Sequence, residues 1–283
     1  MIRDLLVHVD GSRAGRRRVQ FAADLAVRTG ARLSGIHVTP PAEVPPRYEP
    51  RRIAQVAADL SSQLALDAQA AATAFSEEAT GRLADACWFE AEGDVAQGIS
   101  NRSRYGDLVI LEQYEWQASP ETHPLRNAHS VVLRCGRPVL VVPALVQSSS
   151  LARIAIAWDG SREAVRAVHD AWPLFCQSQT IQIVVMIPPS AADNEVDAES
   201  LLAHLAKHGV GIGADVVRIK TEEEHDSLRK QFEQGRYDLL VMGLLAPPVV
   251  RIYLRRTLPV RSLVGENPGA CFPLAQDQAR AVL

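Results

Sequence analysis

Two stretches of the sequence decide the fold: LLVHVDGSRAGRRRVQFAADLA, residues 5–26, and IAIAWDGSREAVRAVHDAWPLF, residues 154–175. Each is a short apolar run that ends in Asp-Gly-Ser-Arg and continues with apolar residues at helical spacing. The two aspartates, Asp10 and Asp159, are 149 residues apart. A strand that passes directly into a helix, found twice, predicts two copies of one α/β unit.

A second pair of similar stretches supports the duplication. YGDLVIL begins at residue 105 and RYDLLVM at residue 236, and Asp107 and Asp238 are 131 residues apart. The second copy is therefore 18 residues shorter. We assign this difference to the proline-rich loop 39–50 and to a long helix expected at about 51–80. The predicted domains are residues 1–147 and 151–283, with a polar junction between them.

Strands and helices alternate along each copy. The strands are apolar runs without strict alternation, which is typical of strands covered by helices on both faces. The predicted fold class is α/β, with two tandem doubly wound domains that each have a five-stranded parallel sheet and helices on both faces. The strands are expected near 4–9, 32–38, 86–91, 108–111 and 139–142 in copy one, and near 153–157, 180–187, 214–220, 239–242 and 270–273 in copy two.

The composition narrows the choice of function. The chain has 283 residues, of which 47% are hydrophobic, and its formal net charge is −3, so nothing favours a nucleic acid or an acidic membrane as a partner. Charges interrupt the first apolar stretch, and no run reaches the ~20 apolar residues of a membrane span, so neither a signal peptide nor a span is expected. The four cysteines form no C-x-x-C pair, which favours reduced thiols and a cytoplasmic location over disulfides or zinc; they are Cys87, Cys135, Cys176 and Cys271.

Ligands of doubly wound sheets bind beyond the carboxyl ends of the strands. Asp10 and Asp159 lie there, where a carboxylate can accept hydrogen bonds from a base or a ribose. The structural interpretation is that Asp-Gly-Ser turns the chain and that Ser12 and Ser161 cap the helices which follow. The two roles are compatible.

The stretches HVDGSRAGRRRVQFAADLA, AWDGSREAVRAVHDAWPLF, GDLVIL, GRPVLVVP and YDLLVMG resemble the universal stress protein (UspA-like) family, in the arrangement of its tandem members. The resemblance implies a five-stranded parallel α/β domain and a role in stress survival rather than one defined reaction. Nucleotide-binding members carry G-x-x-G, nine further residues and G-[S/T] after the fourth strand. The glycines let backbone N–H groups approach the phosphates.

This spacing is half preserved in copy two. Gly243 and Thr257 match, whereas Ala246 and Arg256 stand where the family has glycine. Prolines at 247–248 remove two backbone donors from the turn.

A helix rich in arginine is expected after this turn. Arg255 and Arg256 are interpreted as its exposed charges, and the alternative is that they meet an anion directly.

In copy one, Glu112 and Glu115 occupy the two glycine positions of G-x-x-G, where carboxylates would repel phosphate. Paired carboxylates can also serve acid–base chemistry or hold a metal, but no His or Cys joins them at ligand spacing. His204 and His208 are four residues apart and can share a helix face; without a third ligand, a surface or capping role is preferred. His8 is interpreted as a core histidine.

Three hypotheses remain. The first is a non-enzymatic stress-response module whose domains form an intrachain pseudo-dimer that can associate further into a homodimer, with weak or absent ATP binding. The second is ATP binding, with slow hydrolysis, by copy two alone. The third is an enzyme of another class that uses Asp10, Glu112 and Glu115. No catalytic or metal-ligating residue is assigned, and the candidate cofactor-binding residues are Asp159, Gly160, Ser161, Ile187, Met242, Gly243 and Thr257, with Asp10 in copy one.

Overall fold

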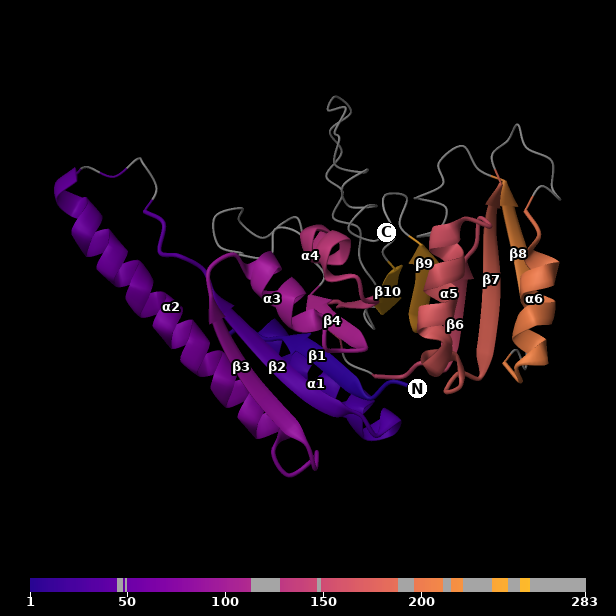
Figure 1. Cartoon of the computed structure of the whole chain (residues 1–283), viewed down its shortest axis with the longest axis horizontal. Coiled ribbons are helices and arrows are strands. Elements are labelled where there is room, and N and C mark those ends of the chain that lie inside the picture. Colours follow the sequence, from indigo (N-terminus) through magenta and orange to yellow (C-terminus); the bar gives the residue numbers. More distant parts are fainter. Residues whose placement is uncertain are drawn as a thin grey trace. The chain divides into compact units, whose positions relative to one another are not determined.

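The computed structural model of the chain (Figure 1) describes residues 1–44, 48, 50–112, 128–146, 149–187, 196–210, 215–220, 236–243 and 250–254. It divides into two compact units, Met1–Arg137 and Pro138–Leu283. Several positions discussed above lie outside the described residues: 115, 246–248, 255–257 and the strand expected at 270–273.

The first unit is built on four parallel strands. Leu5, Leu6 and Val7 of the central strand are at most 2% exposed, because helices cover the sheet on both sides. The strand order is β3 (Ala86–Glu92), β2 (Arg32–Thr39), β1 (Asp4–His8) and β4 (Leu108–Glu112).

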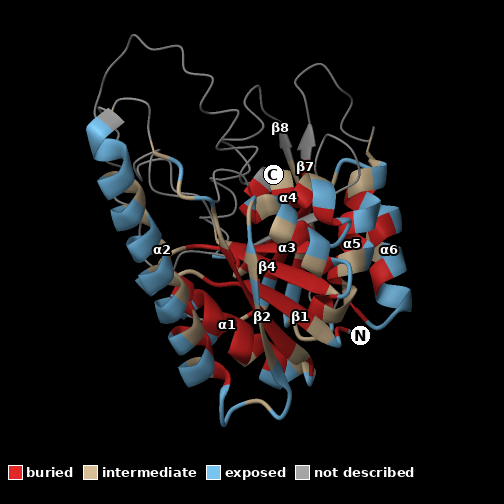
Figure 2. Ribbon diagram, turned by 60° about the vertical axis from the view of Figure 1, so that its left-hand side comes forward, coloured by how far each residue is buried: buried red, intermediate tan, exposed pale blue. Residues whose placement is uncertain are grey.

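Helices pack in two pairs in this unit, α1 beside α2 and α3 beside α4. In Figure 2, where buried residues are red, the ribbon of β1, of β4 and of much of α1 is red. Within the described ranges, no helix is long and apolar enough to cross a membrane. The helices are α1 (Arg13–Thr29), α2 (Pro50–Ala79), α3 (Val95–Ser103) and α4 (Ala128–Cys135).

The second unit repeats the strand order of the first and adds two strands. β8, β7, β6 and β9 correspond to β3, β2, β1 and β4, and β10 and β5 follow. Helix α5 packs on β9 and β10, and α6 packs on β7 and β8. The elements are β5 (Val139–Val142), β6 (Arg153–Ala157), α5 (Arg162–Phe175), β7 (Thr180–Ile187), α6 (Ala198–Lys207), β8 (Asp215–Lys220), β9 (Leu239–Gly243) and β10 (Val250–Leu254).

The α/β fold with parallel strands and two similar units is confirmed, and equivalent contacts show why both copies fold alike. Asp107 accepts hydrogen bonds from the backbone N–H groups of Arg3 (2.7 Å) and Asp4 (3.1 Å). Asp238 accepts the equivalent bond from Arg153 N–H at 3.0 Å. Each aspartate thus joins the start of one central strand to the start of its neighbour.

The helix expected after residue 248 is wrong for Val250–Leu254, which form strand β10. β10 is antiparallel to β9, with Val250 opposite Gly243, and parallel to β5, with Arg251 opposite Val139. Valine, isoleucine and tyrosine favour strands. Six residues separate β9 from β10, too few for the crossover helix that a parallel return requires.

Helix α2 lies unusually close to β2 at Gly35. A Cβ at this position would come within 2.6 Å of the Phe75 ring and 2.8 Å of the Trp88 ring. These two rings are themselves in contact, with centroids 5.3 Å apart. The glycine therefore lets α2 settle on the sheet, which sets where α2 meets the strand ends.

We predict that Gly35→Ala lowers the free energy of unfolding by about 1–3 kcal/mol, because the added methyl overpacks the aromatic pair. Urea unfolding measures the change. Gly106→Ala is the matched control, since its Cβ would meet nothing closer than 3.7 Å. Equal effects of the two substitutions would contradict the close approach of α2.

Candidate functional site

Both Asp-Gly-Ser turns have the same local structure, and the capping interpretation is confirmed. An Oδ1 atom of Asp10 accepts the Ser12 N–H at 2.9 Å, and Asp159 accepts the Ser161 N–H at the same distance. Each serine hydroxyl then accepts a backbone N–H three residues on, at 2.9 Å in α1 and 3.1 Å in α5. These bonds leave the second carboxylate oxygen of each aspartate for another partner.

In the first unit that partner is Arg18, a residue of α1 whose side chain is 1% exposed. Its Nη2 lies 2.6 Å from Oδ2 of Asp10, and its Nη1 lies 2.9 Å from Oε2 of Glu112. Its Nε donates to the backbone oxygen of His8 at 2.8 Å. One guanidinium therefore joins the carboxyl ends of β1 and β4, at the place where the family's nucleotide loop would begin.

The charge of Arg18 also lowers the pKa values of the neighbouring groups Asp10 and His8. Burial raises the pKa of Asp10, but the charge of Arg18, the nearby His8 and the hydrogen bonds from Ser12 and Arg18 together outweigh burial and hold that pKa well below its usual range. Burial lowers the pKa of Arg18, and Asp10 and Glu112 more than reverse the change. Burial, and after it the charge of Arg18, lower the pKa of His8 to about 3. At neutral pH the unit thus holds a charged Arg18, an ionised Asp10 and a neutral His8.

The third hypothesis, an enzyme built on paired carboxylates, loses support from this geometry. Asp10 and Glu112 are both bound to one arginine, so neither is a free acid or base. Among the described residues, no three His, Cys, Asp or Glu side chains are arranged to hold a metal.

A second contact covers the strand ends from the side of α2. The Gly11 N–H donates to Oδ1 of Asp67 at 2.9 Å, and a Cβ on Gly11 would collide with that oxygen. Oδ2 of Asp67 lies 4.0 Å from Nε2 of His37, whose Nδ1 is 2.9 Å from the backbone oxygen of Val9. The carboxylate of α2 thus occupies the turn after β1.

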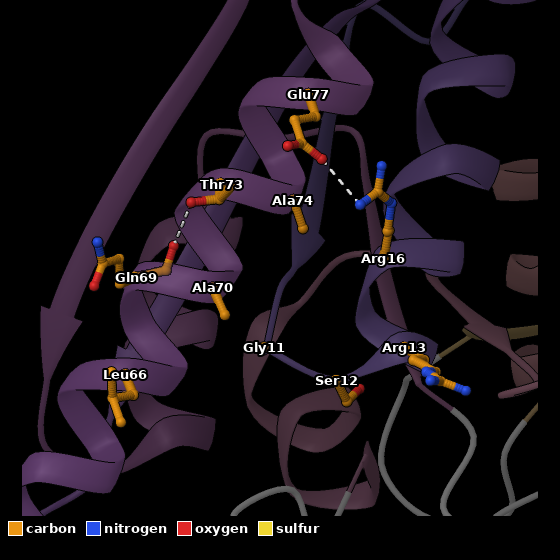
Figure 3. A pocket seen from close by; sticks show the side chains of 10 residues that line it. All are labelled: Gly11, Ser12, Arg13, Arg16, Leu66, Gln69, Ala70, Thr73, Ala74 and Glu77. Carbon is orange, nitrogen blue, oxygen red and sulfur yellow. Dashed lines mark hydrogen bonds and ion pairs between the residues drawn. The ribbon is translucent and has the colours of Figure 1, made fainter.

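A cavity of about 490 Å³ opens beside this contact, between the first turns of α1 and the middle of α2 (Figure 3). Arg16 reaches Glu77 across it at 2.9 Å, so its charge is already balanced. Gly11 and Ser12 of the Asp-Gly-Ser turn line the cavity, whereas Asp10, Arg18 and Glu112 are not among its lining residues. Its lining is Gly11, Ser12, Arg13, Arg16, Leu66, Gln69, Ala70, Thr73, Ala74 and Glu77.

The second unit has small residues where the first has this charged cluster. Strand pairing confirms the equivalence of the copies, because Leu5 lies opposite Leu108 as Ile154 lies opposite Leu239. With the same offsets, His8, Arg18 and Glu112 correspond to Ala157, Ala167 and Gly243.

Gly243 has a packing role in addition to its place in the loop pattern. A Cβ there would lie 2.5 Å from the backbone nitrogen of Ala164 and 2.8 Å from Cβ of Glu163. The first turn of α5 therefore rests directly on this glycine.

The predicted site residues of copy two lie at adjacent strand ends. Gly160 has a φ of 74°, in the left-handed region, and Ser161 caps α5. Ile187 is the last residue of β7, opposite Lys220, and Met242 is buried in β9 at 3% exposure. The pairings β6–β7 and β6–β9 bring the strand ends together, and Asp159, two residues beyond β6, is exposed. Thr257 lies outside the described residues.

Sequence reasoning missed Arg18 and Asp67. Arg18 carries a detectable signal, because it falls among the buried positions Gly15, Val19 and Ala22 of α1. A charged residue on the apolar face of a helix needs a buried partner of opposite charge. Asp67 offers no such signal, since it stands on the long and largely exposed α2.

We predict that Arg18→Met lowers the free energy of unfolding by about 3–5 kcal/mol, because two carboxylates lose their shared cation. Arg16→Met is the control on the same helix: its side chain is 50% exposed, and removal of such a surface pair costs less than about 1 kcal/mol. In a double-mutant cycle, Glu112→Gln should recover part of the loss. A cost for Arg18→Met no larger than that for Arg16→Met would contradict the cluster.

His8 predicts a pH dependence of stability. The unfolded chain binds a proton at His8 near pH 6.5 and the folded chain only near pH 3, so stability is complete above 6.5 and falls as the pH drops below it. The slope from this group is about 1.4 kcal/mol per pH unit. Urea unfolding of the wild type and of His8→Leu between pH 4.5 and 6.5 should differ by this slope. Parallel curves would mean that His8 titrates normally.

The chain is similar to known proteins over part of the first unit in sequence, and over most of its length in structure. Residues 1–103 match the model of the universal stress protein family. No curated protein matches the chain. A universal stress protein from Archaeoglobus fulgidus matches in structure with a TM-score of 0.61 and 13% identity, over 89% of this chain and 98% of that chain. A functionally unknown protein from Pseudomonas aeruginosa matches with a TM-score of 0.50 and 13% identity, over 89% and 92%.

A universal stress protein in complex with cAMP also matches, at 18% identity and a TM-score of 0.30, over 50% of this chain and 98% of that chain. At this level the match carries no argument about a ligand. The strand order of the second unit repeats that of the first. The resemblance seen in the sequence is thus confirmed: residues 1–103 match the model of the universal stress protein family, and the chain shares its α/β fold with a solved protein of that family.

Proposed function

We propose that this protein is a non-enzymatic stress-response regulator in which the first unit binds no nucleotide and the second unit binds ATP weakly or not at all. The observation that carries the proposal is the buried guanidinium of Arg18, held between Asp10 and Glu112 at the strand ends.

In the first unit, a nucleotide would have to displace bonds that already exist. Both oxygens of Asp10 are engaged, by the Ser12 N–H and by Arg18, so neither is free for a ribose or a base. Breaking a buried ion pair costs about 3–5 kcal/mol, and a phosphate would then face the Glu112 carboxylate. Asp67 adds a second negative charge near the turn.

Among the residues of the second unit that the structure describes, the strand ends hold no such cluster. Asp159 is exposed, and Ala167 and Gly243 replace the arginine and the glutamate. Against tight binding, prolines at 247–248 cannot donate N–H bonds to a phosphate, and Gly243 is needed for helix packing. These features support weak binding at most.

ATP binding by the second unit, with slow hydrolysis, is the second candidate function. The exposed carboxylate of Asp159 beside Gly243 favours it. In this form of the proposal, Asp159 meets the adenosine, and Gly243 and Thr257 meet the phosphates.

The proposal includes an intrachain pseudo-dimer of domains 1–147 and 151–283, able to form homodimers in the cytoplasm. Its support is the repeated strand order, which gives the chain two similar α/β units. The wide spacing of the cysteines supports a reducing compartment.

Calorimetric titration with ATP and Mg²⁺ tests the proposal. We expect a dissociation constant above ~100 μM, or no heat of binding. Any binding that is seen should disappear in Asp159→Asn and persist in Asp10→Asn, which alters the equivalent residue of the closed site. A dissociation constant below ~100 μM that depends on Asp159 would replace this proposal with the second candidate, and one that depends on Asp10 would overturn both.

A further inference from the structure

We propose that the pair His204 and His208 of α6 chelates a divalent late transition metal ion on the surface of the second unit, with His169 of α5 as an additional ligand that must move to reach the ion. The proposal does not rest on the nucleotide site, which lies at the strand ends.

The three imidazoles form a compact exposed group. The ring centroids of His204 and His208, four residues apart on one helix, are separated by 4.8 Å. The ring of His169 lies 6.2 Å from that of His204, although the two residues come from different helices. The sequence offered only the pair on α6, and the fold brings the third histidine to it.

In the structure, His204 and His208 form a chelating pair, and a third protein ligand among the described residues is not yet in position. No three potential ligands of the described chain already surround one point as a metal would require. Histidines at i and i+4 face the same side of a helix, so both can bind one ion while water fills the other positions. His169 is exposed and can join by a change of rotamer.

The ligand chemistry selects the metal class. Imidazole suits Cu²⁺, Ni²⁺ and Zn²⁺, and affinity is highest for Cu²⁺ among these ions. The nearby carboxylate of Asp170 is paired with Arg166 at 2.9 Å, so the hard oxygen ligands that Ca²⁺ or Mg²⁺ requires are missing from this group as described.

Trp172 packs against the three imidazoles, and its fluorescence can report metal binding. Its half-buried ring lies 5.0 Å from the ring of His208, 5.8 Å from His204 and 6.4 Å from His169. A paramagnetic Cu²⁺ ion bound by these histidines would therefore sit close enough to quench the fluorescence of Trp172.

The test is a fluorescence titration of the full chain with CuCl₂ at pH 7.4, repeated with ZnCl₂ by calorimetry. We expect saturable quenching at one ion per chain, which Trp172→Phe removes while the calorimetric binding persists. His204→Gln and His208→Gln should each weaken binding by about tenfold or more. His129→Gln, a substitution in α4 of the first unit, is the matched control and should leave binding unchanged.

His169, His204 and His208 are exposed, so their substitution should leave the fold intact, and circular dichroism of each variant checks this. The absence of saturable binding, or equal affinity in the wild type and in His204→Gln and His208→Gln, would overturn the site. An unchanged affinity in His169→Gln would overturn the contribution of α5.

Discussion

The first unit depends on one buried interaction, the guanidinium of Arg18 between the carboxylates of Asp10 and Glu112. It joins the apolar face of α1 to the ends of β1 and β4, where a doubly wound sheet ordinarily offers its ligand site. A buried arginine is tolerable because it is paired with both carboxylates and bonded to the His8 carbonyl. The ion pairs that hold α1 to the strand ends therefore also occupy the place where a nucleotide would bind.

The two copies share the same scaffold contacts, but several residues at their strand ends differ together. The scaffold contacts are repeated: an aspartate binds the start of each central strand, and a serine caps the helix that follows each Asp-Gly-Ser turn. At the strand ends, one copy has a charged set of residues and the other a set of small ones. The residues of each set depend on one another. A buried arginine without its carboxylates would be an unpaired charge. A glutamate in place of Gly243 would collide with the first turn of α5.

Local pattern predicted most of the fold. The strands expected from apolar runs agree with β1 to β9 to within about one residue, because burial on both faces leaves a strong signal in the sequence. The exception is β10, where an arginine-rich stretch suggested a helix, and the short connection with its strand-favouring residues produced an antiparallel return. In the candidate site, the sequence predicts that Asp10 accepts hydrogen bonds from a ligand and that Glu112 repels phosphate, whereas the structure pairs both carboxylates with Arg18.

The sequence by itself determined the duplication, the α/β class and the capped turns, because these follow from periodicity and from hydrogen bonds between residues a few positions apart. Tertiary structure decided what the strand ends can do. Arg18 and Glu112 are 94 residues apart and Gly11 and Asp67 are 56 apart, and each contact forms because separate strands and helices converge on one edge of the sheet. Likewise, His169 meets His204 only where α5 and α6 pack together. Such encounters depend on packing, which no local pattern encodes.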